Sequence, residues 1–73
     1  MHPLLAPTSG TVWKIAIPAG ENVAKNDVVL IVESMKMEVP VEAPVAGRLV
    51  ELLVAEGDTV HEDQILANVE GAA

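Results

Sequence analysis

The chain has 73 residues, four basic and eleven acidic side chains, a formal net charge of −7 and no cysteine. This length suffices for one small domain, residues 1–73, with a thin core and little room for a catalytic cleft. The acidic balance disfavours nucleic acid and anionic membrane surfaces, because binding to phosphate groups requires a basic surface. Without cysteine there is no disulfide and no thiolate metal site, so stability must come from aliphatic packing.

The sequence pattern predicts neither a targeting segment nor a membrane-spanning segment. Met1–Leu5 lacks a basic segment followed by a long apolar one, so it does not read as a signal peptide. The longest purely aliphatic run, Val28–Val32, is far too short to cross a bilayer. Together with the absence of cysteine, these features favour a cytoplasmic protein.

The first half of the chain predicts two strands joined by a turn. Thr11–Ile17 alternates with a period of two residues, and Pro18 closes the strand. Ala19–Asn22 has the composition of a turn, with Gly20 free to adopt positive φ. Val28–Val32 is a short apolar run typical of a buried strand. No segment shows helical periodicity, so we expect an all-β domain.

The second half repeats this pattern 37 residues later. Residues 3–33 align with 40–70 without a gap, and eight of the 31 pairs are identical, where composition alone would give about two or three. Arg48–Val54 then corresponds to the alternating strand, Glu56–Thr59 to the turn and Ile65–Val69 to the buried strand. A unit used twice predicts a small sandwich or barrel of two quasi-two-fold-related, four-stranded sheets.

The repeat also predicts where the link between the two copies lies. Adding 37 to Lys36 gives Ala73, so the pseudo-two-fold pairs the link 34–37 with the chain ends. We therefore expect a tight hairpin over residues 34–37, with Lys36 at its tip. The two termini should lie together at the opposite end of the domain.

Lys36 stands between Met35 and Met37, and this triplet is the segment most suggestive of function. Methionine is apolar and normally fills gaps in a core. Two methionines beside a turn would expose apolar surface without a folding benefit, which indicates a binding surface. The structural alternative is that the methionines pack onto the domain and that Lys36 is an ordinary solvated lysine.

The run Val32–Pro40 closely resembles the attachment site of biotinyl (biotin carboxyl carrier) domains, members of the biotin/lipoyl attachment family. The resemblance covers nearly the whole chain and implies a flattened β-barrel, the barrel-sandwich hybrid. It implies that Lys36 carries biotin as an amide. Ser34 departs from the alanine most common before the first methionine, a small change that leaves the triplet intact.

The same resemblance implies roles for the neighbours of the attachment lysine. Met35 and Met37 would form an adaptable apolar surface for the modifying enzyme and later for carboxylase sites. Glu33 and Glu38 would assist recognition by the modifying enzyme, although solvated charge on a hairpin explains them nearly as well.

The resemblance further implies a carrier and not an enzyme. A solvated lysine amine is mostly charged at pH 7, and the segment offers no neighbouring base, so a biotin protein ligase must deliver activated biotin. The domain would then shuttle carboxyl groups from a biotin carboxylase site, using ATP and bicarbonate, to a carboxyltransferase site. We expect it to act as a monomeric module. The ungapped repeat leaves no room for the thumb insertion of some carriers, so the type is compact.

Two other functions remain open. A lipoyl domain of a 2-oxoacid dehydrogenase or glycine cleavage system places its lysine on the same hairpin, usually between an acidic and a small apolar residue. An unmodified structural barrel module would have no reason to keep methionine on both sides. Met1 and the complete pair of repeats favour a free-standing protein, although an excised domain with an added methionine would look the same.

An independent enzyme is the weakest candidate, because no acid–base pair, nucleophile or metal cluster emerges from the sequence. His2 and His61 are isolated, with no third ligand at metal spacing, and are predicted to lie on the surface. Trp13, the only aromatic residue, is predicted in the core or at a half-buried strand position. The acceptor substrate of any carboxylation stays open.

Overall fold

The computed structural model describes residues 1–71, and within this range the regular elements are eight strands. They form an elongated molecule with extents of 38 × 16 × 16 Å. In chain order the strands are β1 (His2–Leu5), β2 (Gly10–Ile15), β3 (Asn22–Val23), β4 (Val28–Ser34), β5 (Met37–Glu42), β6 (Gly47–Leu52), β7 (Thr59–Val60) and β8 (Ile65–Gly71).

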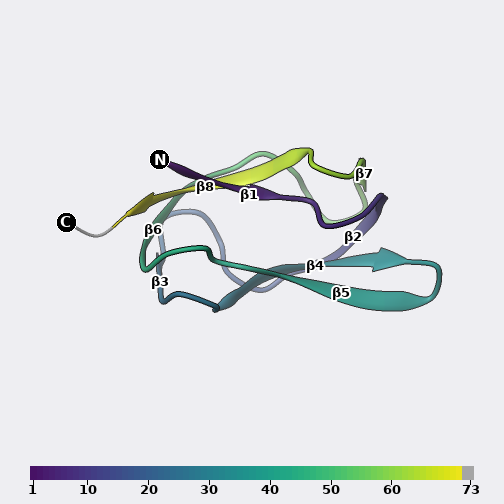
Figure 1. The fold of residues 1–73 in the computed structure, drawn as a ribbon, viewed down its shortest axis with the longest axis horizontal. Helices are drawn as coiled ribbons and strands as arrows, with labels where there is room; N and C mark the ends of the chain where they lie inside the picture. The colour runs from purple at the N-terminus through teal and green to yellow at the C-terminus, as the bar shows by residue number, and fades with distance from the viewer. Residues whose placement is uncertain (72–73) are drawn as a thin grey trace.

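The strands make two four-stranded antiparallel sheets that face one another (Figure 1). Sheet A has the order β1-β8-β6-β3, and sheet B has the order β5-β4-β2-β7. Each sheet therefore combines strands from both repeats. A shift of 37 residues converts the bounds of β2, β3 and β4 into those of β6, β7 and β8. The predicted all-β architecture of two quasi-two-fold-related, four-stranded sheets is confirmed.

One aliphatic core fills the space between the sheets, and none of the described buried residues is polar or charged. Alternation along the strands sends every second side chain inward, and each fully buried Val or Leu contributes about 1.5–3 kcal/mol. Each of the eight strands contributes at least one buried residue, and Ala6 and Ala43 follow directly after β1 and β5. The buried set is Leu4, Ala6, Val12, Val23, Val29, Leu30, Val32, Val41, Ala43, Leu49, Val60, Leu66, Ala67 and Val69.

Both alternating strands contain a β-bulge and end earlier than the sequence predicts. The register of β2 against β4 shifts between Val12 and Lys14, which leaves Trp13 as the extra residue. Trp13 is 49% exposed, so it occupies a strand position outside the core. β2 ends at Ile15 and not at residue 17, because the next two N–H groups both bond to the carbonyl of Val29.

Four turns adopt positive φ at positions related by the repeat. Gly20 and Gly57 have φ values of 97° and 94°, as the turn composition predicts. Asn26 and Asp63 have values of 73° and 66°, and these residue types tolerate the left-handed region better than most. Equivalent backbone therefore bends in the same way in both copies.

The hairpin and the chain ends lie at opposite ends of the long axis (Figure 1). At the end of the molecule opposite the hairpin, β1 begins and β8 ends, and the His2 ring lies against Gly71. Ala73, the residue equivalent to Lys36, lies outside the described residues. The hairpin between β4 and β5 is thus the free tip of the molecule.

Candidate functional site

The tip of the molecule is a two-residue turn. The β4–β5 register runs to the pair Ser34 and Met37, which leaves Met35 and Lys36 as the connecting residues. Their φ values are 50° and 67°. Positive φ at both central residues defines a type I′ turn, whose twist matches that of the flanking strands. The sequence predicts this hairpin and its tip, but not the left-handed backbone of two non-glycine residues.

The turn directs three long side chains into solvent. Met35 is 93% exposed and Met37 is 67% exposed, and Lys36 between them is also exposed. The methionines therefore do not pack into the domain, and the structural explanation for them fails. An exposed apolar pair around a primary amine is a surface that another protein can bind, with the amine available as a nucleophile once a partner deprotonates it.

A pair of carboxylates lies directly behind the turn. Glu33 on β4 and Glu38 on β5 are paired in register and both are exposed. Like charges directly opposite each other destabilise an antiparallel pair, so this arrangement gives the hairpin no stability. Ser34, the next residue toward the turn, is only partly exposed. The five site residues predicted from the sequence therefore lie together at one end of the molecule: Glu33, Met35, Lys36, Met37 and Glu38.

The remaining candidates from the sequence do not join this site. His2 and His61 are exposed, as predicted. Within residues 1–71, no group of three or more His, Cys, Asp or Glu side chains is placed to hold a metal ion. The same range contains no helix that is long and apolar enough to cross a membrane.

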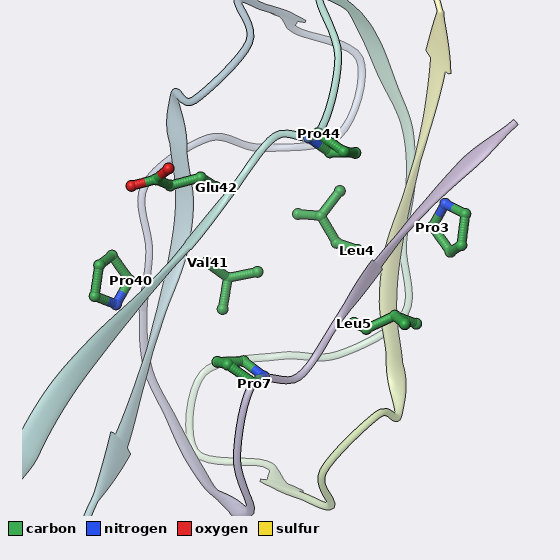
Figure 2. A pocket seen from close by; sticks show the side chains of 8 residues that line it. All are labelled: Pro3, Leu4, Leu5, Pro7, Pro40, Val41, Glu42 and Pro44. Carbon is green, nitrogen blue, oxygen red and sulfur yellow. The ribbon is translucent and has the colours of Figure 1, made fainter.

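A shallow apolar hollow of about 320 Å³ lies between β1 and β5, and sequence reasoning did not find it (Figure 2). Its floor is Leu4 and Val41, which belong to the core. It is lined by residue pairs related by the repeat: Pro3 and Pro40, Leu4 and Val41, Leu5 and Glu42, Pro7 and Pro44. None of the hairpin residues lines it, so the hollow is the seam where the two halves meet.

The fold and the tip together define a class of small all-β domain, in which two repeat-related sheets carry an exposed lysine on the hairpin that joins the repeats. The family model described as "Biotin-requiring enzyme" matches residues 2–69. The chain belongs to this biotin/lipoyl attachment family.

Two relatives of this chain differ greatly in length. The chain is 38% identical over 64 residues to the biotin/lipoyl attachment protein of Bacillus subtilis, and this match covers 88% of each chain. Its sequence identity to the pyruvate carboxylase of Aspergillus niger is also 38% over 64 residues, and that match covers 88% of this chain and 5% of that protein.

A solved structure shows the same fold. The urea carboxylase of Kluyveromyces lactis matches with a TM-score of 0.90 and 30% sequence identity. The match covers 94% of this chain and 6% of that one. This domain therefore corresponds to a small part of such carboxylases and to most of the small attachment protein.

Proposed function

We propose that residues 1–73 act as one biotin carboxyl carrier domain, with biotin attached to Lys36 through an amide. The observation that carries the proposal is the amine at the tip of the hairpin, set between two exposed methionines. Membership of a biotin-requiring family and similarity to pyruvate and urea carboxylases support biotin as the cofactor.

The described residues fit an acyl group attached to Lys36. Lys36 is exposed in the left-handed turn, and its two chain neighbours are uncharged, so the amine can enter a partner's site without desolvating a charge on either neighbour. Its nucleophilicity must come from that partner, a biotin protein ligase, because both neighbouring side chains are methionines and offer no base. When attached, biotin supplies a nitrogen that takes up and releases a carboxyl group.

The domain itself contributes position and reach. The tip lies at the far end of a 38 Å molecule from the chain ends, so a tether at those ends would leave it free to visit different sites. Such tethering raises the effective concentration of the carried group. The partners in this proposal are the biotin carboxylase and carboxyltransferase components of a carboxylase. The domain presents its attached biotin to both of them as a cytoplasmic, monomeric module.

Modification of Lys36 tests the proposal directly. The chain is co-expressed with a biotin protein ligase and, separately, with a lipoate ligase, and intact mass and peptide maps are recorded. We expect one biotinyl adduct, on Lys36, with Lys36→Arg folded and unlabelled. Lys25→Arg, which changes another exposed lysine, is the matched control and should be labelled in full.

Other outcomes would assign other functions. A lipoyl adduct on Lys36 would identify a lipoyl carrier, and no adduct from either ligase would indicate an unmodified structural barrel. Labelling of folded Lys36→Arg would show that the attachment site lies elsewhere. Replacing Met35 and Met37 with leucine separates their roles, because normal labelling with slower carboxyl transfer would place that role after attachment.

A further inference from the structure

Three exposed apolar side chains lie on neighbouring segments of sheet A. Leu5, Leu53 and Ile65 are 45%, 51% and 46% exposed. Leu5 and Ile65 are paired in register between β1 and β8. The N–H of Leu53, just after β6, donates to the carbonyl of Leu66 at 2.9 Å. We refer to Leu5, Leu53 and Ile65 as the apolar row.

All three residues of the apolar row point to the solvent side of the sheet. Leu5 lies between two buried residues, Leu53 lies between two residues that pack against the core, and Ile65 precedes a buried leucine. Because successive side chains of a strand point to opposite faces, the row faces outward. Figure 2 shows Leu4 turned toward Val41, with Leu5 on the other side of β1.

The other half of the molecule contains the same backbone arrangement with different side chains. The equivalent residues are Glu42, Ala16 and Val28. Val28 and Glu42 are paired in register, and the N–H of Ala16 donates to the carbonyl of Val29 at 2.8 Å. Because one charged residue and two smaller apolar residues occupy the equivalent backbone positions in the other half, folding does not require large apolar side chains at the positions of the row. Exposed apolar side chains without a folding role indicate a binding surface.

The charges at three equivalent positions also differ between the two faces, with opposite sign at two of them. Beside the apolar row, the Glu51 carboxylate accepts a hydrogen bond from Asn68 of β8 at 2.8 Å. The turn at Glu62 and Asp63 adjoins the end of β1, where the Asp63 N–H donates to the carbonyl of Ala6 at 2.8 Å. The residues equivalent to Glu51, Glu62 and Asp63 are Lys14, Lys25 and Asn26. The apolar row thus has an acidic rim.

We propose that the apolar row and its acidic rim form the surface that docks onto the biotin carboxylase component, an inference that rests on the proposed function. A site that binds ATP and bicarbonate requires positive potential to hold these anions. Basic side chains around such a site complement the acidic rim, while the row packs against an apolar patch. β7 lies on the hairpin side of the molecule (Figure 1). The chain passes from β7 through a short turn to Ile65 of the row, the first residue of β8.

The experiment converts each face into the other. In the row variant, Leu5→Glu, Leu53→Ala and Ile65→Val introduce the residues that the other half already carries. In the control variant, Glu42→Leu, Ala16→Leu and Val28→Ile make the reverse changes. Both chains are biotinylated by the ligase, and the initial rate of ATP-dependent carboxylation is measured against carrier concentration. The enzyme is the biotin carboxylase component of an acyl-coenzyme A carboxylase that accepts the wild-type chain.

We expect the row variant to raise KM for the carrier about tenfold, as for loss of a central apolar contact, with kcat and the rate of biotinylation unchanged. The control variant should keep the wild-type KM. Added salt should raise the wild-type KM by screening the rim, and Glu62→Lys with Asp63→Asn should weaken this salt dependence.

Three results would overturn the inference. The first is an unchanged KM for a folded row variant, and the second is an equal rise for the control variant. The third is slower biotinylation with normal carboxylation, which would assign the surface to the ligase. A wild-type chain that accepts no biotin would overturn the proposed function and this inference with it, whereas a biotinylated and carboxylated chain with an unaltered row variant would overturn the inference alone.

Discussion

The turns inside the two repeats differ from the turn at the hairpin tip in the residues that hold positive φ. Inside the repeats, glycine, asparagine and aspartate occupy the left-handed positions, and all three tolerate this region better than other residues. At the tip, Met35 and Lys36 occupy it. A left-handed backbone costs a residue with a Cβ roughly 1–2 kcal/mol.

The repeat turns also carry side-chain hydrogen bonds that support their backbone. The Asp27 carboxylate accepts from the N–H of Ala24 at 2.8 Å, and Gln64 accepts from the N–H of His61 at 2.9 Å. The tip has side chains that point away from the protein instead. This difference indicates that folding selects the residues of the repeat turns, whereas Met35 and Lys36 occupy the tip at a cost in stability.

Among changes to the turns, the largest effect on stability is expected from replacing Gly20 or Gly57, the glycines with positive φ. A Cβ at Gly20 or Gly57 would meet nothing within 4 Å, so the cost of alanine is conformational. Each of Gly20→Ala and Gly57→Ala should lower the free energy of unfolding by about 1–2 kcal/mol, as measured by urea denaturation. Ala19→Ser, beside Gly20, is the control. A neutral result would show that alanine adopts the turn without strain.

The next effect concerns the side chains that support these turns. Asp27→Ala and Gln64→Ala each remove one hydrogen bond to a backbone N–H, and should cost about 0.5–1.5 kcal/mol. Both hydrogen bonds are exposed to solvent, so values at the lower end are expected. Lys25→Ala, in the same turn as Asp27, should leave the urea midpoint unchanged. Unequal losses at the two equivalent sites would break the correspondence between the repeats.

The hairpin tip should respond in the opposite direction. Asparagine is favoured at the first central position of a type I′ turn, so Met35→Asn should raise the free energy of unfolding by up to about 1 kcal/mol. The rate of biotinylation should fall, because an apolar contact for the ligase is lost. Met37→Asn, on the strand side of the turn, should give no gain in stability. A stabilised Met35→Asn with normal labelling would assign Met35 no role in recognition by the ligase.

The sequence was sufficient to predict the features that repeat. Apolar alternation and the 37-residue offset predict β2, β4, β6 and β8, and Gly20 and Gly57 have their expected positive φ, but no bounds were predicted for β1 and β5. The two-residue strands β3 and β7 were missed, since Asn22 and Thr59 fall in segments with turn composition. No sequence rule predicts left-handed φ at Met35 and Lys36, because the intrinsic preferences of both residues oppose it.

The apolar row was missed for a different reason. An apolar residue in an alternating strand reads as a core residue until the bulges and the ends of the strands are known. The predicted strand Arg48–Val54 passes through Leu53, whereas β6 ends at Leu52. Only the paired backbone positions of Leu5 and Ile65 show that these side chains share one outer face.

The smallest effect concerns the carboxylates behind the tip. Glu38→Gln removes one member of the cross-strand pair with Glu33, and should stabilise the hairpin by at most about 0.5 kcal/mol, since both groups are exposed. The gain should appear at low ionic strength and shrink in high salt, because salt screens exposed charges. Glu42→Gln is the matched control, because Glu42 on the same strand faces Val28 and no carboxylate. Urea midpoints at two salt concentrations give the comparison. An equal gain at both salt concentrations would show that repulsion between Glu33 and Glu38 does not destabilise the hairpin. The presence of the pair would then require no role in recognition.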